Sequence, residues 1–201
     1  AILISGSGTG MEAIINYQNS SSCLHETVLV ISNKSDVKGV QKAENKKILT
    51  KIIELPKEAQ NPRELHEKLI QKELEENNVE VVILSGYMRI LSPKFVEKWI
   101  GRLLNIHPSL LPKFPGANAH KDVLAAGVRE SGCTVHFVDN GIDTGPIIAQ
   151  EKVQVFLEDS LEDLQNRVKL KEHLIYPKVL DLLCEGRLSI DENQEVIIKH
   201  H

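Results

Sequence analysis

Cysteine is scarce in this chain, and its spacing excludes two kinds of site. The 201 residues include three cysteines, Cys23, Cys133 and Cys184, which lie far apart in the sequence. They form no Cys-x-x-Cys pair for a metal and no even-numbered set for a disulfide framework. We therefore expect free thiols in a reducing cytoplasm.

Long apolar runs and a dominant charge of one sign are also missing. No run approaches the about 20 residues that a membrane-spanning helix needs, and no signal peptide is visible. The 24 basic and 28 acidic residues give a formal charge of −4, which argues against a mainly electrostatic binder of nucleic acid. We expect one compact cytoplasmic domain with neither a membrane nor a nucleic-acid partner. Because Ala1 already lies in an apolar run, we also expect a trimmed chain or a domain of a longer polypeptide.

Two strong phosphate-binding motifs are absent from the first turn of the chain, Gly6-Ser7-Gly8-Thr9-Gly10. Met11 stands where the dinucleotide fingerprint needs a third glycine, and no Gly-Lys-Ser/Thr follows as in a P-loop. The N-H groups of a glycine-rich turn at a helix start still favour a phosphate, so a phosphomonoester is the remaining interpretation. A turn that serves only close packing is the structural alternative.

Apolar strand-like runs alternate with helical patterns along the chain. This alternation predicts an α/β fold: a mostly parallel twisted sheet with helices on both faces and a Rossmann-like N-terminal half. The predicted strands are 1–5, 27–32, 79–85, 102–106, 133–138 and 147–155, with a closing hairpin over 187–190 and 195–199. The predicted helices are 11–17, 37–46, 62–77, 119–126 and 160–184.

Two of these helices carry more specific expectations. In the helix over 62–77, we expect Leu65, Leu69 and Leu74 to form the apolar face. The sequence Ser160-Leu161-Glu162-Asp163 matches a helix-start signature. Pro177 should kink or restart the long helix that follows, because proline removes a helical hydrogen bond.

The most informative segment is Asn105-Ile106-His107-Pro108-Ser109-Leu110-Leu111-Pro112, followed later by Asp143-Thr144-Gly145-Pro146. Asn105 and His107 are two residues apart, so on a strand both side chains leave from the same face. An amide donor and an imidazole beside one atom suit acyl transfer, in which an oxyanion develops and the attacking amine loses a proton. Asp143 would then orient the ring or raise its basicity.

Six blocks of residues extend almost from end to end of the chain. They are Gly6-Ser7-Gly8-Thr9, Ile31-Ser32-Asn33-Lys34, the segments 86–92, 105–112 and 132–138, and Glu172-His173. Together they resemble the phosphoribosylglycinamide (glycinamide ribonucleotide) formyltransferase family, most specifically over 86–145. The resemblance implies an enzyme that transfers a formyl group from 10-formyltetrahydrofolate to the amine of glycinamide ribonucleotide in de novo purine biosynthesis.

The resemblance also implies a role for individual residues. Asn105 and His107 would stabilise the oxyanion, while Asp143 would tune His107 and aid proton transfer. The implied substrate-binding residues are Gly8, Thr9, Gly10 and Glu172. The implied folate-binding residues are Met88, Arg89, Ile90, Leu91, Val138, Asp139, Asn140 and Gly141. The family usually has Asn where this chain has Gly10, so any contact from that side chain to the phosphate is lost.

The same resemblance implies the organisation and partners of the protein. Residues 1–201 would form one formyltransferase domain, with a phosphate-binding half over 1–105 and a folate-binding and catalytic half over 106–201. The two small-molecule substrates are the expected partners, and no metal is required. Linkage to other purine-pathway domains is an expected context for a longer form of the chain. Relatives also suggest a cis Leu111–Pro112 bond, which suits the sharp turn after Pro108.

Several residues have two interpretations that the sequence leaves open. His136 could support Asn105 or His107, or simply be buried. Arg63, at a helix start, could meet the folate tail or lie in solvent. Tyr87 and Met88 could belong to the core, and Asn118 and His120 could line the substrate cleft.

Three other functions are alternatives at this stage. Another enzyme that uses 10-formyltetrahydrofolate, a deformylase or a formyltransferase for a different amine, is the nearest alternative. A metallohydrolase built on His107, His136 and Asp143 is a second, which we reject because their spacing matches no known ligand pattern and formyl chemistry needs no metal. A non-catalytic nucleotide-binding module is the third.

Overall fold

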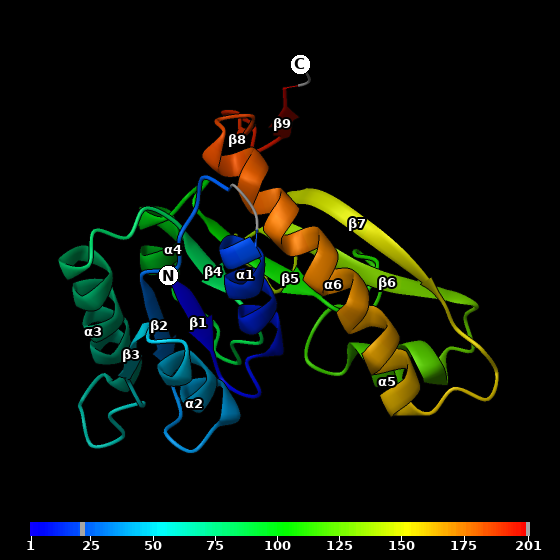
Figure 1. Ribbon diagram of the computed structural model, residues 1–201, viewed down its shortest axis with the longest axis horizontal. Helices are drawn as coiled ribbons and strands as arrows, with labels where there is room; N and C mark the ends of the chain where they lie inside the picture. Colours follow the sequence, from blue (N-terminus) through cyan, green and yellow to red (C-terminus); the bar gives the residue numbers. More distant parts are fainter. Residues whose placement is uncertain (21–22, 200–201) are drawn as a thin grey trace.

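A seven-stranded sheet forms the centre of the protein (Figure 1). The computed structural model describes residues 1–20 and 23–199. The strand order is β3-β2-β1-β4-β5-β6-β7; β1 to β5 are parallel, and β6 and β7 are antiparallel additions at one edge. The strands are β1 Ile2–Ile4, β2 Leu29–Ser32, β3 Leu49–Ile52, β4 Val82–Leu84, β5 Leu103–His107, β6 Glu130–Phe137 and β7 Ile147–Gln154. The predicted mostly parallel sheet is confirmed.

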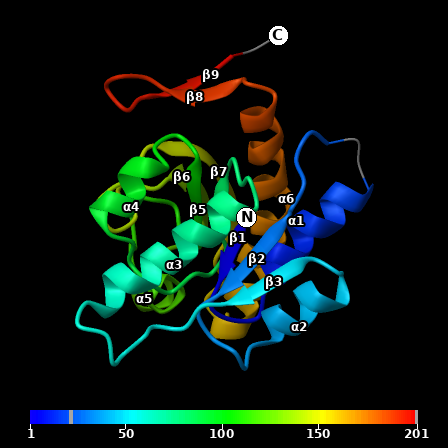
Figure 2. The same cartoon turned by 90° about the vertical axis from the view of Figure 1, so that its left-hand side faces the viewer.

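Helices cover both faces of this sheet (Figure 2). Ile2 and Ile4 pack into one apolar cluster, whereas Leu3 between them packs into the other, because successive strand side chains point to opposite faces. On the first face lie α1 Thr9–Ser20, α2 Lys38–Asn45, α5 Ala119–Ala125 and α6 Leu161–Cys184. On the second lie α3 Pro62–Glu76 and α4 Pro93–Lys98. Burial on both faces explains why the central strands are continuous apolar runs.

The order of the strands brings three sequence motifs to one edge of the sheet. From β1 the chain first adds β2 and β3 on one side, and then adds β4 and β5 on the other. Ligands of such sheets bind outside the carboxyl ends of the strands, at the point where the order reverses. The turn 6–10 follows β1, the segment 85–92 follows β4, and Asn105 and His107 end β5.

Helix α3 buries a different face from the predicted one. Leu65 and Leu69 are 39% and 40% exposed, so of the predicted stripe only Leu74 is buried. The buried residues of α3 are His66, Glu67, Ile70 and Leu74. The prediction was wrong because it followed hydrophobicity alone. The polar His66 is accepted inside because both of its ring nitrogens have hydrogen-bond partners.

Two elements were not predicted, β3 and α4. All four residues of β3 are at least partly exposed at the sheet edge, and its lysine interrupts any apolar run. Helix α4 has only six residues, but it begins at a Ser-Pro pair in which the Ser92 hydroxyl accepts the Phe95 N-H. That start signal is visible in the sequence, whereas the edge strand has no comparable one.

Helix α6 crosses the first face of the sheet beside β6 and β7 (Figure 1). Ser160 and Asp163 form the predicted capping box at its start. The predicted restart at Pro177 is wrong, because the helix continues through this residue. Pro177 is buried, as are the nearby Tyr176 and Val179. The predicted closing hairpin is confirmed as β8 Leu188–Ile190 and β9 Val196–Ile198. Within the described part of the chain, no helix has both the length and the apolarity to cross a membrane.

Candidate active site

A cavity of about 640 Å³ opens at the carboxyl ends of β1, β4 and β5. Its walls include the turn 6–10, the segment 84–91, residues from both ends of the 105–120 region, and one side of α6. The cavity therefore lies where the strand order predicts a ligand site.

Asn105, His107 and Asp143 meet in this cavity. His107 Nδ1 lies 3.2 Å from Asp143 Oδ2, and Asn105 Nδ2 lies 3.5 Å from Asp143 Oδ1. One carboxylate thus contacts both groups, although 36 residues or more separate it from them in the sequence. The predicted convergence of the amide, imidazole and carboxylate is confirmed.

Both ring nitrogens of His107 face hydrogen-bond acceptors. Nδ1 faces the Asp143 carboxylate, and Nε2 lies 2.8 Å from the Phe114 carbonyl. A neutral imidazole carries only one N-H, which can donate to one of these two acceptors, and an imidazolium can donate to both. The two contacts fix the orientation of the His107 ring inside the cavity, beside the amide of Asn105.

Asp143 is held in a specific and strained conformation. Its φ angle is 54°, in the left-handed region that is costly for a residue with a side chain. Oδ2 also accepts the Gly116 N-H at 2.8 Å. Burial would raise the pKa of Asp143, but contacts with His136 and Gly116 and the charge of His107 outweigh it and hold the pKa below its ordinary value. The carboxylate therefore stays ionised near pH 7.

His136 contacts Asn105 from the neighbouring strand β6. Its Nδ1 lies 2.8 Å from the Phe137 carbonyl, and its Nε2 lies 3.7 Å from Asp143 Oδ1 and 3.3 Å from Asn105 Nδ2. This contact fixes which end of the Asn105 amide faces Asp143. Of the two interpretations of His136, burial and support of Asn105, both hold.

The glycine-rich turn begins helix α1 at the cavity wall. Gly8 has a φ of 65°, and a Cβ added there would lie 2.7 Å from the Gly39 Cα. Close packing against α2 therefore accounts for Gly8 itself. Gly10 is different, because a Cβ there would meet only the Ser85 Oγ, at 2.5 Å. Since residues 6–10 also line the cavity, the turn combines a packing role with a free helix start, where a phosphate is favoured.

Helix α6 supplies a second polar wall of the cavity. Of its residues, the sequence-based prediction included only Glu172. Gln165, Lys169, Glu172 and Tyr176 all line the cavity. Their spacing of four, three and four residues is a helical stripe, which is the signal that could have found them. Burial raises the pKa of Glu172 to about 7, although Lys169 opposes the shift. His120, on the other side, also lines the cavity, and burial lowers its pKa to about 4.

The segment 88–91, three apolar residues and Arg89, forms a wall of the same cavity. Met88 and Ile90 are 67% and 63% exposed, so Met88 is not a core residue, whereas Tyr87 and Leu91 are buried. Val138, Asp139 and Gly141 also line the cavity. Large exposed apolar side chains at a concave surface are typical of a ligand contact.

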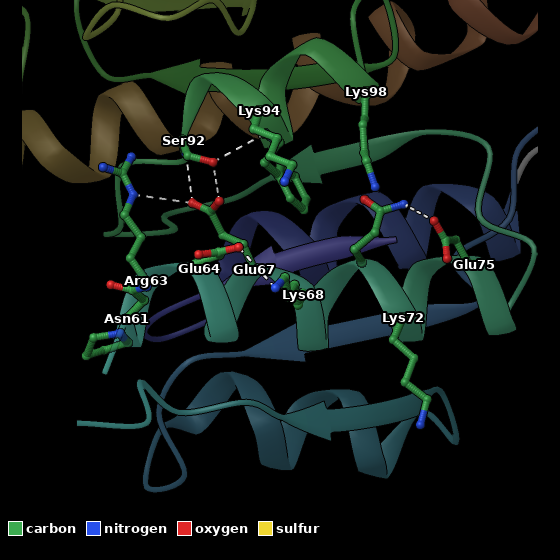
Figure 3. A pocket seen from close by; sticks show the side chains of 13 residues that line it. Asn61, Arg63, Glu64, Glu67, Lys68, Lys72, Glu75, Ser92, Lys94 and Lys98 are labelled. Atoms are coloured by element: carbon green, nitrogen blue, oxygen red, sulfur yellow. Dashed lines mark hydrogen bonds and ion pairs between the residues drawn. The ribbon is translucent and has the colours of Figure 1, made fainter. Parts of the chain in front are cut away.

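Two predicted site residues lie elsewhere. Asn140 is exposed and does not line this cavity. Arg63 lines a second cavity, of about 650 Å³, between α3 and α4, where its Nε lies 3.4 Å from Glu67 (Figure 3). The predicted cis bond between Leu111 and Pro112 is confirmed.

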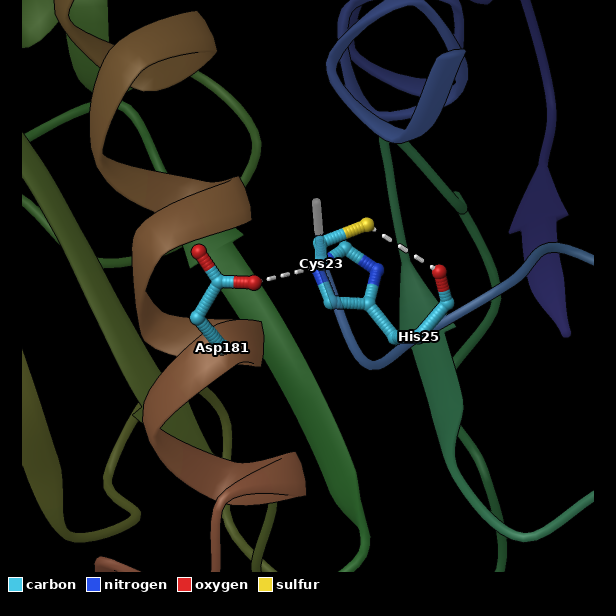
Figure 4. A group of neighbouring side chains, drawn as sticks. All are labelled: Cys23, His25 and Asp181. Carbon is cyan, nitrogen blue, oxygen red and sulfur yellow. Dashed lines mark hydrogen bonds and ion pairs between the residues drawn. The ribbon is translucent and has the colours of Figure 1, made fainter. Parts of the chain in front are cut away.

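One group of three potential metal ligands occurs among residues 1–20 and 23–199, and it lies outside this cavity. It consists of Cys23, His25 and Asp181, whose ligand atoms lie within 4.8 Å of one another (Figure 4). His25 Nε2 lies 3.1 Å from Asp181, Gln18 contacts its Nδ1 at 2.8 Å, and the Cys23 thiol donates to the His25 carbonyl. These partners identify the group as a link between α1 and α6. It contains none of the residues of the metallohydrolase alternative.

Comparison with known proteins assigns the family. A model of the family described as formyl transferase matches residues 1–180. The chain belongs to the formyl transferase family. This formyl transferase is 43% identical over 192 residues to the phosphoribosylglycinamide formyltransferase of Escherichia coli (strain K12), and the match covers 96% of this chain and 90% of that protein.

Two further relatives extend the comparison. The formyl transferase is 48% identical over 199 residues to the trifunctional purine biosynthetic protein adenosine-3 of Gallus gallus, covering 99% of this chain but 20% of that protein. It therefore spans about a fifth of the trifunctional relative's length. The crystal structure of glycinamide ribonucleotide transformylase 1 from Symbiobacterium toebii has a TM-score of 0.92 and 37% identity, and the match covers 99% of this chain and 92% of that one. The same mostly parallel sheet with its flanking helices is thus found in an enzyme of this family.

Proposed function

We propose that this formyl transferase moves a formyl group from 10-formyltetrahydrofolate to the amine of glycinamide ribonucleotide in purine biosynthesis. The observation that carries the proposal is the contact of one Asp143 carboxylate with both Asn105 and His107 inside a cavity that also reaches the turn 6–10. The names of the relatives support the choice of substrates, because both the bacterial enzyme and the superposed structure carry this activity in their names.

In the proposed reaction, the substrate amine attacks the formyl carbon. The oxyanion that forms is stabilised by the Asn105 amide, whose present contacts are long at 3.3 and 3.5 Å, and by the positive charge of His107. The amine must lose one proton and the departing folate nitrogen must gain one. In the proposed step His107 gives a proton to the departing folate nitrogen and then takes one from the amine, and the Asp143 carboxylate that contacts the ring aids this transfer.

The two substrates would occupy different walls of the cavity. N-H groups at the start of α1, from Gly8 to Gly10, would bind the phosphate of the ribonucleotide, and Glu172 would accept hydrogen bonds from its ribose hydroxyls. The segment 88–91 with Val138, Asp139 and Gly141 would bind the folate. Arg63 and Asn140 have no part in this arrangement, since neither lines the cavity.

We further propose that residues 1–201 act as one domain in the cytoplasm and require no metal for the reaction. The division at residue 105 does not separate the two substrates. The phosphate turn and the segment 88–91 come from the first half, whereas Glu172 and Asp143 come from the second. The trifunctional relatives make fusion to other purine-pathway domains a natural context for this domain.

The proposal is tested by following the loss of 10-formyltetrahydrofolate with and without glycinamide ribonucleotide. Turnover should require the ribonucleotide, with tetrahydrofolate and the formylated ribonucleotide formed in equal amounts. Turnover that proceeds in water alone, at a rate that the ribonucleotide does not change, would identify a deformylase instead. Turnover that requires a different amine would leave the chemistry intact but refute the substrate.

A further inference from the structure

The segment 86–92, which we call the wall loop, is held at both ends by two adjacent residues of α3. Its inner part, 88–91, lines the main cavity, but His66 and Glu67 do not. His66 contacts the loop at Tyr87, and Glu67 contacts it at Ser92. Both α3 residues are buried, at 1% and 7% exposure, which is unusual for polar side chains, and Glu67 also lines the second cavity between α3 and α4.

The contact at the first end fixes the hydrogen positions of His66. Nδ1 lies 3.2 Å from the Glu54 carbonyl and must donate to it, so Nε2 accepts from the Tyr87 hydroxyl at 3.0 Å. Burial lowers the pKa of His66, so the ring stays neutral near pH 7 and keeps this arrangement. Burial also places the pKa of Tyr87 above its usual range, so its hydroxyl keeps the hydrogen that it donates.

The contact at the second end uses both oxygens of Glu67 (Figure 3). Oε1 accepts the Ser92 N-H at 2.7 Å, and Oε2 accepts the Ser92 hydroxyl in a shorter hydrogen bond. Arg63 lies 3.4 Å from the same carboxylate. Hydrogen bonds to an ionised group are about twice as strong as neutral ones, so Glu67 holds Ser92 firmly at the start of α4.

A third anchor lies between these two ends. The Met88 N-H donates to the Ser5 hydroxyl at 2.8 Å. With the Tyr87 side chain and the backbone at 88 and 92 held by these contacts, the exposed side chains of Met88 and Ile90 are presented to the cavity by a short, restrained loop. Such restraint lowers the entropy that a ligand must remove when it binds.

We infer that His66 and Glu67 are positioning residues that set the affinity for the folate co-substrate by clamping the wall loop. The inference rests on the proposed function in one respect, namely that residues 88–91 bind the folate. It assigns α3 a role in recognition although no α3 side chain lines the catalytic cavity.

The test is a comparison of Michaelis constants in Glu67→Ala. Loss of the clamp should raise the KM for 10-formyltetrahydrofolate about tenfold, equivalent to about 1.4 kcal/mol, while the KM for the ribonucleotide and kcat change by less than about threefold. Glu67→Gln keeps the size and one acceptor oxygen, so it should restore most of the folate affinity. Glu64→Ala is the matched control, because Glu64 lies on the same helix and bonds only to Lys68 among its contacts in Figure 3.

A second variant covers the case in which Glu67→Ala fails to fold. Tyr87→Phe removes one hydroxyl from the other end of the clamp and should raise the folate KM by about threefold, with little change in the melting temperature. An unchanged folate KM in either folded variant would overturn the inference. So would an equal rise in both Michaelis constants, since that would mean a general structural role.

The proposed function and this inference fail in different ways. If the wild-type enzyme transfers no formyl group to the ribonucleotide, the proposed function fails, and calorimetric titration with tetrahydrofolate replaces the kinetic test. Weaker binding of tetrahydrofolate by Glu67→Ala than by wild type and Glu64→Ala would then support the clamp. Equal binding by all three proteins, or no binding by wild type, would overturn it.

Discussion

At the scale of single residues, the chemistry depends on which groups can donate to a developing oxyanion. Asn105 Nδ2 has only long contacts, of 3.3 and 3.5 Å, whereas His107 Nε2 is bonded to Phe114 at 2.8 Å. The amide is therefore the more available donor in the proposed reaction, and the proposed role of His107 is to contribute a positive charge at the same place. Removing either group should leave the other unable to replace it, because the two stabilise the same atom in different ways.

Asn105→Ala and His107→Ala should each lower kcat by about 100-fold or more while the protein remains folded. Steady-state kinetics with both substrates, together with circular dichroism and thermal melting, checks the prediction. Asp143→Asn should also be severely impaired, and its pH-rate profile should shift, because the charge beside His107 is gone. Near wild-type turnover in Asn105→Ala or His107→Ala would refute the catalytic assignment.

If Glu172 binds the ribonucleotide as proposed, its raised pKa predicts a pH dependence of known sign. Its pKa is raised from 4.5 to about 7 by burial, so the side chain is a neutral acid below about pH 7 and a carboxylate above it. The carboxylate accepts hydrogen bonds from the two hydroxyls more strongly than the neutral acid does, so the KM for the ribonucleotide should fall as the pH rises through 7. Glu172→Gln should abolish this change. Dividing the KM of the wild type by the KM of the variant at each pH removes the effect of titration of the substrate itself.

The same shift predicts an effect on stability. The folded protein binds the Glu172 proton more tightly than the unfolded chain, so this group destabilises the fold progressively as the pH rises from 4.5 to about 7. Glu172→Gln lacks this loss, and its stability relative to wild type should therefore increase over that window in urea denaturation. A difference that is constant with pH would mean that Glu172 is not protonated in the folded protein.

The meeting of Asn105, His107 and Asp143 could be predicted from the sequence, but much of the cavity wall could not. The two-residue period of a strand places Asn105 and His107 together, and the motif around Asp143 was recognisable. Lys169 and Gln165 reach the cavity only because α6 crosses the sheet. They lie about 60 residues along the chain from Asn105 and His107, and the only local sign of their position is a polar helical stripe. For the same reason, a position at a helix start did not reveal that Arg63 faces a separate cavity.

At the scale of elements, the start of α1 has one glycine that packing requires and one that it does not. Gly8 needs its positive φ and its contact with Gly39, so a side chain there acts on the fold as well as on any ligand. Gly10 meets only the end of the Ser85 side chain, which can rotate. Position 10 is therefore the better probe of how the phosphate is bound.

Gly10→Asn should change the affinity for glycinamide ribonucleotide by less than about tenfold, or about 1.4 kcal/mol, because backbone N-H groups would bind the phosphate. Isothermal titration with the ribonucleotide and with tetrahydrofolate measures it. Gly8→Ala, in contrast, should lower the melting temperature, since a positive φ costs about 1–2 kcal/mol for a residue with a Cβ. Loss of ribonucleotide binding in a stably folded Gly10→Asn protein would contradict backbone recognition.

The capping box of α6 offers a test of local stability. Ser160 accepts the Asp163 N-H, and the Asp163 carboxylate accepts the Ser160 N-H at 3.0 Å. Ser160→Ala should lower the free energy of unfolding by about 1 kcal/mol, as measured in urea. Ser189→Ala, at an exposed serine of β8, should change it by less than about 0.5 kcal/mol. Equal values for the two variants would mean that the box does not stabilise α6.

Strands that are buried on both faces of the sheet were predicted well, whereas the edge strand β3 and the buried face of α3 were not. Continuous apolar runs marked β1, β2, β4 and β5, because both faces of the sheet are covered. The edge strand β3 has only one neighbour and one lysine among four residues, so it resembled a loop. The buried face of α3 was missed because His66 and Glu67 are buried through their hydrogen bonds rather than through apolar character.

At the scale of the whole molecule, the reversal of strand order between β1 and β4 creates the site. It places the turn after β1 beside the segment after β4. Strand β5, which carries Asn105 and His107, pairs with β4 and therefore ends next to both. The antiparallel strands β6 and β7 then carry the chain back so that Asp143, in the connection between them, reaches β5. One continuous sheet therefore supports groups from all parts of the chain. The proposed phosphate half and folate half are ranges of the sequence, and residues of both halves line the same cavity.

The most direct test of the central claim follows the formyl carbon itself. Wild-type enzyme is incubated with glycinamide ribonucleotide and 10-formyltetrahydrofolate labelled with ¹³C in the formyl group, and the label is traced by NMR spectroscopy. We expect the label to move into an amide of the ribonucleotide, and to stay on the folate when His107→Ala replaces the wild type. Label that appears in free formate, or that stays on the folate with wild-type enzyme, would contradict formyl transfer to the ribonucleotide.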